Sequence, residues 1–146
     1  MATFSVDGLK EFEMNLEAIV EGGKSLAKQI LEAEAAVVEA KQKSVGRAMG
    51  VYDETSGSSI HVINKVAHGK MQSKNNEYRM FVYPQGTRTR GYTESTNSEI
   101  GFINEYGKTG QAARPWISTA DSQCEEQALD AAGEVFDKFL EENGLV

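Results

Sequence analysis

The chain of 146 residues has few of the features that mark disulfide-rich, metal-binding and membrane-spanning proteins. Its single cysteine, Cys124, excludes an intrachain disulfide framework, and its two histidines, His61 and His68, have no metal-ligand spacing around them. No run approaches the roughly 18 apolar residues of a membrane span, and the N-terminus has no basic region followed by an apolar segment. We therefore expect a soluble protein made in the cytoplasm, with no metal ion and no membrane contact.

The sequence also lacks a recognisable catalytic constellation. Neither histidine lies in a nucleophile motif, and there is no Gly-x-Ser-x-Gly elbow. Residues 107–109, Gly-Lys-Thr, look like the end of a phosphate-binding loop, but such a loop requires a glycine where Phe102 stands. Pro115 also follows where the phosphate-capping helix should already be running. We therefore expect no enzymatic activity and no nucleotide or other cofactor.

Charge is unevenly distributed along this acidic chain, whose formal net charge is −7 at pH 7. Residues 60–92 hold six Lys and Arg and one Glu, a net charge of +5, whereas residues 125–146 carry −6 and residues 1–21 carry −4. An acidic protein does not embrace nucleic acid with its whole surface. Either these segments are solvated faces of different elements, or copies meet through complementary patches, or the basic segment faces a polyanion.

Helical periodicity marks both ends of the chain. Apolar residues spaced by three and four predict a short amphipathic helix over residues 7–21. Gly22 and Gly23 are expected to interrupt it, and a second helix with one apolar stripe follows over residues 25–44. The clearest pattern predicts a long amphipathic helix over residues 115–142.

Strand signals lie between these helices. Residues 60–66 alternate in polarity and residues 78–83 are rich in aromatic and aliphatic side chains, so an antiparallel hairpin is the economical pairing. Residues 84–98 are polar and rich in Gly, Thr and Ser, which predicts a long mobile loop. Arg88 and Arg90 in this loop either are solvated or contact a partner protein or DNA phosphates.

Together these elements predict an α+β fold in a single domain of residues 1–146. It consists of a small antiparallel β-sheet packed against an N-terminal helix pair and a long C-terminal helix. The composition, 40% hydrophobic and 25% charged residues, is that of one globular domain. Residues 99–106 are too short an apolar run for periodicity to separate a strand from a short helix.

The segment before the last helix has a local explanation of its own. Trp116 stands at the helix start, where it is expected to act as a hydrophobic staple, and Arg114 is expected to pair with Glu105 or another acid. Cys124 lies on the apolar stripe of the same helix and is expected to be a small buried side chain. Packing alone therefore accounts for these residues, unless they also serve contacts with a partner.

Residues 100–120 contain a pattern of residue types that can be compared with known families. The pattern begins with an apolar stretch and continues with Glu-aromatic-Gly, a short spacer, Ala-Arg-Pro-aromatic-apolar and a long amphipathic helix. The residues of this chain that match the pattern are Ile100, Phe102, Ile103, Glu105, Tyr106, Gly107, Ala113, Arg114, Pro115, Trp116, Ile117 and Ala120. The pattern resembles the tail-component family of long-tailed phages and prophages, also described as tail-completion, neck or head-tail joining proteins. The chain departs from the family by an inserted Lys108 and, before the first strand, an inserted Ser56.

The resemblance implies a small α+β subunit without catalytic activity that assembles as a ring where the DNA-filled head meets the tail tube. The implied location is the virion, after synthesis in the host cytoplasm. The implied partners are other copies of the chain, neighbouring neck and tail-tube proteins and, through non-specific contact, DNA in the lumen. Candidate contact residues are Glu105, Tyr106, Gly107, Arg114, Pro115 and Trp116, with Arg88 and Arg90 as further loop contacts. The competing interpretation is a small nucleic-acid-associated protein that uses the basic segment 60–92.

Overall fold

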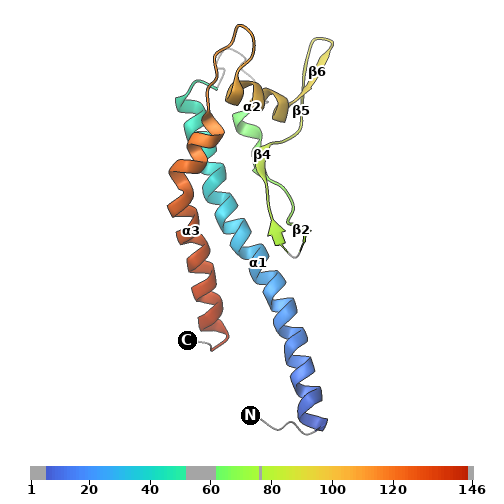
Figure 1. The fold of residues 1–146 in the computed structure, drawn as a ribbon. Coiled ribbons are helices and arrows are strands. Elements are labelled where there is room, and N and C mark those ends of the chain that lie inside the picture. Colours follow the sequence, from blue (N-terminus) through green and yellow to red (C-terminus); the bar gives the residue numbers. More distant parts are fainter. Residues whose placement is uncertain (1–5, 52–61, 76, 145–146) are drawn as a thin grey trace.

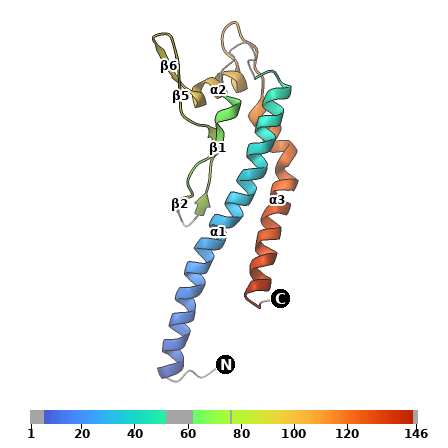
Figure 2. The same cartoon turned by 180° about the vertical axis from the view of Figure 1, so that it is seen from behind.

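Two long helices form the frame of the protein. The structure is a computed structural model that describes residues 6–51, 62–75 and 77–144, with the backbone alone described for residues 6–21 and Arg90. The helices are α1 (Val6–Ala48) and α3 (Trp116–Glu142). They lie side by side and antiparallel, and the N-terminal part of α1 extends beyond the C-terminal end of α3 (Figures 1 and 2). With the strands described below, the predicted α+β class is confirmed.

The predicted N-terminal helix pair is wrong, because α1 is one continuous helix through Gly22 and Gly23. Each glycine in a helix interior costs about 1 kcal/mol relative to alanine, but it keeps both backbone hydrogen-bonding groups. A helix end commonly requires a residue with positive φ, and neither glycine has one. That conformation comes at Gly50, with φ of 76°, directly after the helix. The glycine pair therefore weakens the helix without ending it.

A β arm, residues 66–84, lies along α1. It pairs antiparallel strands in two steps, β1 (Val66–His68) with β4 (Val82–Pro84) and β2 (Gln72–Lys74) with β3 (Glu77–Arg79). The carboxylate of Glu39 in α1 accepts a hydrogen bond from the backbone N–H of His68 at 2.6 Å, which ties the arm to the helix. The predicted antiparallel hairpin is confirmed, although it consists of two-stranded pairs and not one sheet.

The first strand begins later than residues 60–66 predicted. Residues 60 and 61 lie outside the described residues, and Ile63–Lys65 form a short 3-10 helix, η2, before β1 begins at Val66. The neighbours Val62 and Ile63 are both buried, with 1% and 0% of their surfaces exposed. Successive side chains of a strand point to opposite faces, so a half-buried strand cannot bury both. A helical turn here puts both residues into the core.

The predicted loop of residues 84–98 is also wrong, because most of it forms a hairpin. Strands β5 (Thr87–Arg90) and β6 (Thr93–Thr96) pair antiparallel around a two-residue turn whose Gly91 has φ of 64°. Threonine is β-branched and favours extended backbone, which the abundance of polar residues concealed. Helix α2 (Asn97–Tyr106) follows at once, with a capping box between Thr96 and Glu99. Residues 99–106 are therefore helical.

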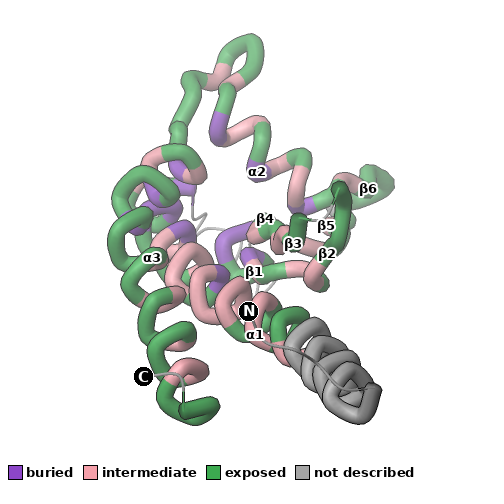
Figure 3. Tube along the Cα trace, turned by 60° about the horizontal axis from the view of Figure 1, so that its bottom comes forward, coloured by how far each residue is buried: buried purple, intermediate pink, exposed green. Residues whose placement is uncertain are grey.

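The core lies where the C-terminal end of α1 meets η2, β1 and the start of α3. Its buried members are Val45, Val51, Val62, Ile63, Val66, Trp116 and Ala120. The buried segments of these elements gather there, while much of the remaining length of α3 is exposed (Figure 3). The core therefore fixes one end of the helix pair and the elements around the 100–120 motif.

Candidate functional site

Trp116 joins three helices at the centre of the motif. Its side chain is fully buried, and its indole N–H donates a hydrogen bond to the backbone oxygen of Gly101 in α2 at 3.2 Å. On the other side it lies against Gly46 of α1. A Cβ atom added to Gly46 would lie 3.1 Å from the ring, and one added to Gly101 would lie 3.4 Å from it. Glycine at both positions therefore lets α1 and α2 approach the indole closely.

Glu105 projects from α2 onto the first turn of α3. One carboxylate oxygen accepts the backbone N–H of Ile117 at 2.7 Å, and the other accepts the backbone N–H and hydroxyl of Ser118 at 3.2 and 2.6 Å. The residue is buried. A carboxylate at a helix N-terminus satisfies free N–H groups and interacts favourably with the helix dipole. Glu105 therefore acts as the N-terminal cap that Pro115 cannot supply through its own side chain.

Arg114 was predicted to pair with Glu105 or another acid, and it forms no ion pair with Glu105 or with any other acid of the described residues. The guanidinium of Arg114 instead donates to the backbone oxygen of Gly50 at 3.1 Å, beyond the end of α1, and its backbone N–H donates to Asn104 at 2.6 Å. Helix C-termini leave backbone oxygens unpaired, which a cation satisfies well. Arg114 therefore links the end of α1 to the segment that leads into α3, and Arg114 itself is exposed to solvent.

Replacing Glu105 with glutamine is expected to lower the free energy of unfolding by about 2 kcal/mol, because the charge and one acceptor oxygen are lost at a buried helix N-terminus. Urea denaturation followed by circular dichroism measures the change. The matched control is Glu125→Gln, which changes an exposed carboxylate on α3, the helix that Glu105 caps, and for which we expect less than about 0.5 kcal/mol. Equal losses in the two variants would contradict the capping role.

Gly107 ends α2 in a conformation that favours glycine, with φ of 77° and ψ of 176°. Its N–H donates to the oxygen of Ile103 at 2.8 Å, and the next residues form a tight turn in which Lys108 and Gln111 exchange backbone hydrogen bonds. The Gly-Lys-Thr triplet thus follows the C-terminus of a helix, where backbone oxygens are exposed. A phosphate-binding loop needs the opposite end, where backbone N–H groups point at the ligand.

An aromatic pair forms the exposed face of α2. Phe102 and Tyr106 stack with their ring centroids 5.8 Å apart and their planes 9° from parallel. They are 54% and 73% exposed. Two aromatic side chains four residues apart on a helix lie on the same face. Of the sequence candidates, Tyr106, Arg114 and Pro115 therefore lie at the surface, whereas Glu105 and Trp116 face inward and serve contacts within the chain.

A cationic cleft lies between the β5–β6 hairpin and α2. It has a volume of about 540 Å³, and its lining residues include Arg88, Ser95, Asn104, Lys108 and Gln111. The fold thus brings Arg88 next to the turn that carries Lys108, although twenty residues separate them in sequence. Arg90 follows on the same strand, close to the hairpin turn, and the structure describes its backbone alone.

No family model, curated protein or solved structure matched this chain. In the described part of the chain, no helix is long and apolar enough to span a membrane. The same residues contain no group of three or more His, Cys, Asp and Glu side chains placed to hold a metal ion.

Cys124 is a core residue of α3, as its sequence position predicted, with 1% of its surface exposed. Burial raises the pKa of its thiol above the ordinary value, and the negative charge of Asp121 raises it further. Since the thiolate is the reactive form, this cysteine stays protonated and unreactive near neutral pH.

Sequence reasoning missed several contributors to this site. Phe102 was recognised only as an apolar motif position, although its spacing of four from Tyr106 signals an aromatic pair on one helix face. The sequence marks Lys108 as part of a false phosphate loop and as an insertion relative to the phage family, and neither observation predicts that it lines a cleft. The packing roles of Gly46 and Gly101 have no sequence signal, because the indole that contacts both comes from a distant helix.

Proposed function

We propose that the protein is a non-enzymatic virion structural protein that assembles as a ring at the phage head-tail junction, where it completes the tail and joins it to the DNA-filled head. The observation that carries this proposal is the division of the 100–120 motif into an inward set of residues, which pack within the chain, and an outward set, which are exposed. Glu105, Gly107 and Trp116 build the junction of α1, α2 and α3. The pattern that resembles the phage family therefore coincides with the residues that set the geometry of this junction.

The outward set has the chemistry of a protein-protein contact. Phe102 and Tyr106 expose a stacked aromatic surface, and Arg114 is exposed nearby in the chain. Aromatic residues and arginine are enriched in the cores of interfaces and among the residues that dominate binding energy. Because helix α2 is held by capping at its start and by Glu105 at its end, this surface is presented with little loss of entropy on binding.

The cleft beside α2 supports a second kind of contact. Arg88 and Lys108 both line it, so it is suited to acidic side chains of a neighbouring neck or tail-tube protein, or to DNA phosphates in the lumen of the ring. In this proposal the partners are other copies of the chain, adjacent neck and tail-tube proteins, and DNA through non-specific contact.

The test mixes purified protein with isolated tail tubes of a phage that carries this gene, and counts capped tube ends by electron microscopy. The wild-type protein is expected to form rings or caps at the ends. The double variant Phe102→Ser and Tyr106→Ser is expected to bind at least about tenfold more weakly, because exposed aromatic anchors dominate such interfaces. The control is Tyr92→Ser, which removes an aromatic side chain that is even more exposed, from the β5–β6 turn.

A wild-type protein that leaves tube ends uncapped under all conditions would overturn the proposal. The competing function, nucleic-acid binding through the basic segment, is favoured by the exposed Lys70 and Lys74 on the β arm. It predicts DNA binding by the free protein that weakens steeply with salt and is reduced by Lys70→Ser with Lys74→Ser. Tail capping by the wild-type protein, together with weak DNA binding, would favour the ring.

A further inference from the structure

The outer face of α3 combines apolar and acidic side chains. Leu129 and Phe136 are 61% and 44% exposed, and their spacing of seven residues puts them on one line along the helix. One side of that line carries exposed acids at helical spacing, namely Glu126, Asp130, Glu134, Asp137 and Glu141. None of these acids forms an ion pair with another residue in the described ranges. An apolar line beside a strip of one charge is typical of a contact surface.

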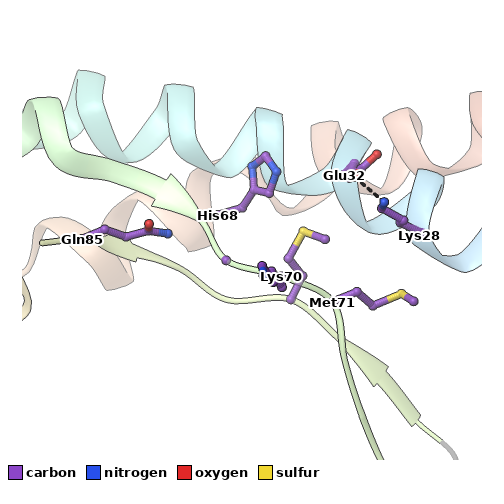
Figure 4. A pocket seen from close by; sticks show the side chains of 8 residues that line it. Lys28, Glu32, His68, Lys70, Met71 and Gln85 are labelled. Atoms are coloured by element: carbon purple, nitrogen blue, oxygen red, sulfur yellow. Dashed lines mark ion pairs between the residues drawn. The ribbon is translucent and has the colours of Figure 1, made fainter.

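A cavity with the complementary chemistry lies between α1 and the β arm. Its volume is about 670 Å³, and its lining residues include Met71 and Met80 as apolar groups and Lys28 and Lys70 as cations. Figure 4 shows Lys28 on α1, with its ammonium group turned to Glu32 of the same helix, and Lys70 and Met71 on the segment that faces this helix. Lys28 has only a long ion pair, 3.9 Å from Glu32 on its own helix. Methionine side chains adapt to the shape of an inserted apolar group.

We infer that the outer face of α3 in one copy docks into the cavity beneath the β arm of the next copy. The line of Leu129 and Phe136 lies against the methionines, and the acidic strip faces Lys28 and Lys70. This inference rests on the proposed ring, for which it names the contact between subunits. The cavity is lined by two lysines and one acid, Glu32; in the described ranges Lys70 forms no ion pair and Lys28 only the long one with Glu32. The occupant is a second copy because this chain displays an apolar and acidic face that matches the methionines and these lysines.

The contact joins two different surfaces. A symmetric contact between two α3 outer faces would bring like charges together, which costs free energy. Within one chain the two surfaces cannot meet, because α1 separates the C-terminal half of α3 from the β arm (Figures 1 and 2). Each copy therefore offers one donor face and one acceptor cavity. Such a head-to-tail contact closes into a ring when the rotation between subunits permits.

Charge reversal on each side separately, and then on both, tests this contact. The cavity-side variant is Lys28→Glu with Lys70→Glu, and the helix-side variant is Glu134→Lys with Asp137→Lys. The variant that combines all four changes has the net charge of the wild type and restores opposite signs across the contact. Sedimentation velocity over a concentration series at low salt measures self-association, and circular dichroism verifies folding.

Each one-sided variant is expected to raise the self-association dissociation constant at least about tenfold, and the four-residue variant to restore it to within about threefold of wild type. The control, Glu94→Lys on β6, changes an exposed charge outside both surfaces and is expected to have little effect. An equimolar mixture of the two one-sided variants is expected to associate, because their surfaces are then complementary.

Unchanged association in the one-sided variants, no recovery in the four-residue variant, or a wild-type chain that stays monomeric up to its solubility limit would overturn the contact. The tail-tube assay separates this failure from failure of the proposed function. If the charge reversals behave as expected but wild-type protein leaves tube ends uncapped, the self-contact stands and the phage function fails. If the wild-type protein caps tubes and the one-sided variants assemble and cap equally well, the function stands and this contact fails.

Discussion

Replacing Trp116 with alanine is expected to lower the free energy of unfolding by about 3–5 kcal/mol, as for other buried tryptophans. The side chain is fully buried, and the substitution removes its hydrogen bond to the oxygen of Gly101. The neighbouring Gly46 and Gly101 have no side chains that could move into the cavity. Since this is the only tryptophan in the chain, urea unfolding is best followed by circular dichroism.

The control for this prediction is Trp116→Phe, which keeps an aromatic ring between α1 and α2 and loses the N–H donor. It is expected to cost about 1–2 kcal/mol, the sum of a lost hydrogen bond and a smaller packing defect. A further control, Tyr92→Ala, removes an exposed ring and is expected to change stability by less than about 0.5 kcal/mol. If Trp116→Ala resembled Tyr92→Ala, the indole would not be the centre of the junction.

Replacing Gly107 with alanine is expected to cost about 2–3 kcal/mol, since its backbone conformation is one that only glycine adopts without strain. The added Cβ atom would also lie 2.8 Å from the backbone nitrogen of Ala113 and 2.8 Å from the backbone oxygen of Gln111. Both contacts are with backbone, so the turn between α2 and α3 would have to shift. Thermal and urea unfolding measure the loss.

The matched control is Gly110→Ala in the same turn. Gly110 also has a positive φ, 80°, but a Cβ atom there would meet nothing within 4 Å. The expected cost is therefore the backbone term alone, about 1 kcal/mol. Equal losses at the two positions would show that the close approach of residues 111–113 to Gly107 does not contribute.

Two kinds of element were predicted correctly from the sequence, for the same reason. The C-terminal helix was expected over residues 115–142 and forms over Trp116–Glu142, because apolar residues recur there at helical spacing for many turns. The antiparallel pairing of the β arm followed from two strand-like runs close together in the chain. In both cases the determining pattern is local.

The errors have specific physical causes. The pair Gly22-Gly23 was interpreted as a helix end, although a glycine with helical φ costs propensity and breaks no hydrogen bond. The polar residues 87–96 were interpreted as a loop, although threonine favours extended backbone and Gly91 allows a tight turn. Polar residues do not argue against a strand such as β6, which is largely exposed to solvent.

Within residues 100–120, the sequence did not predict the packing roles of the individual residues. Residues 100–120 do form the junction of α1, α2 and α3, yet Glu105 caps α3 where an ion pair with Arg114 was expected. The distinction between inward and outward residues depends on which face of α2 packs on Trp116. That face is set by the packing of α2 against Trp116 of α3 and against Pro84 of β4, which no pattern within α2 encodes.

The sequence by itself determined the α+β class, the long C-terminal helix, the antiparallel arm and the failure of the Gly-Lys-Thr triplet as a phosphate loop, because periodicity and motif spacing are properties of neighbouring residues. Only the tertiary structure decided that Gly46 and Gly101 contact one indole, that Arg88 shares a cleft with Lys108, and that Phe102 and Tyr106 face outward. These arrangements arise from contacts between residues far apart in the chain, whose free energy no local pattern encodes.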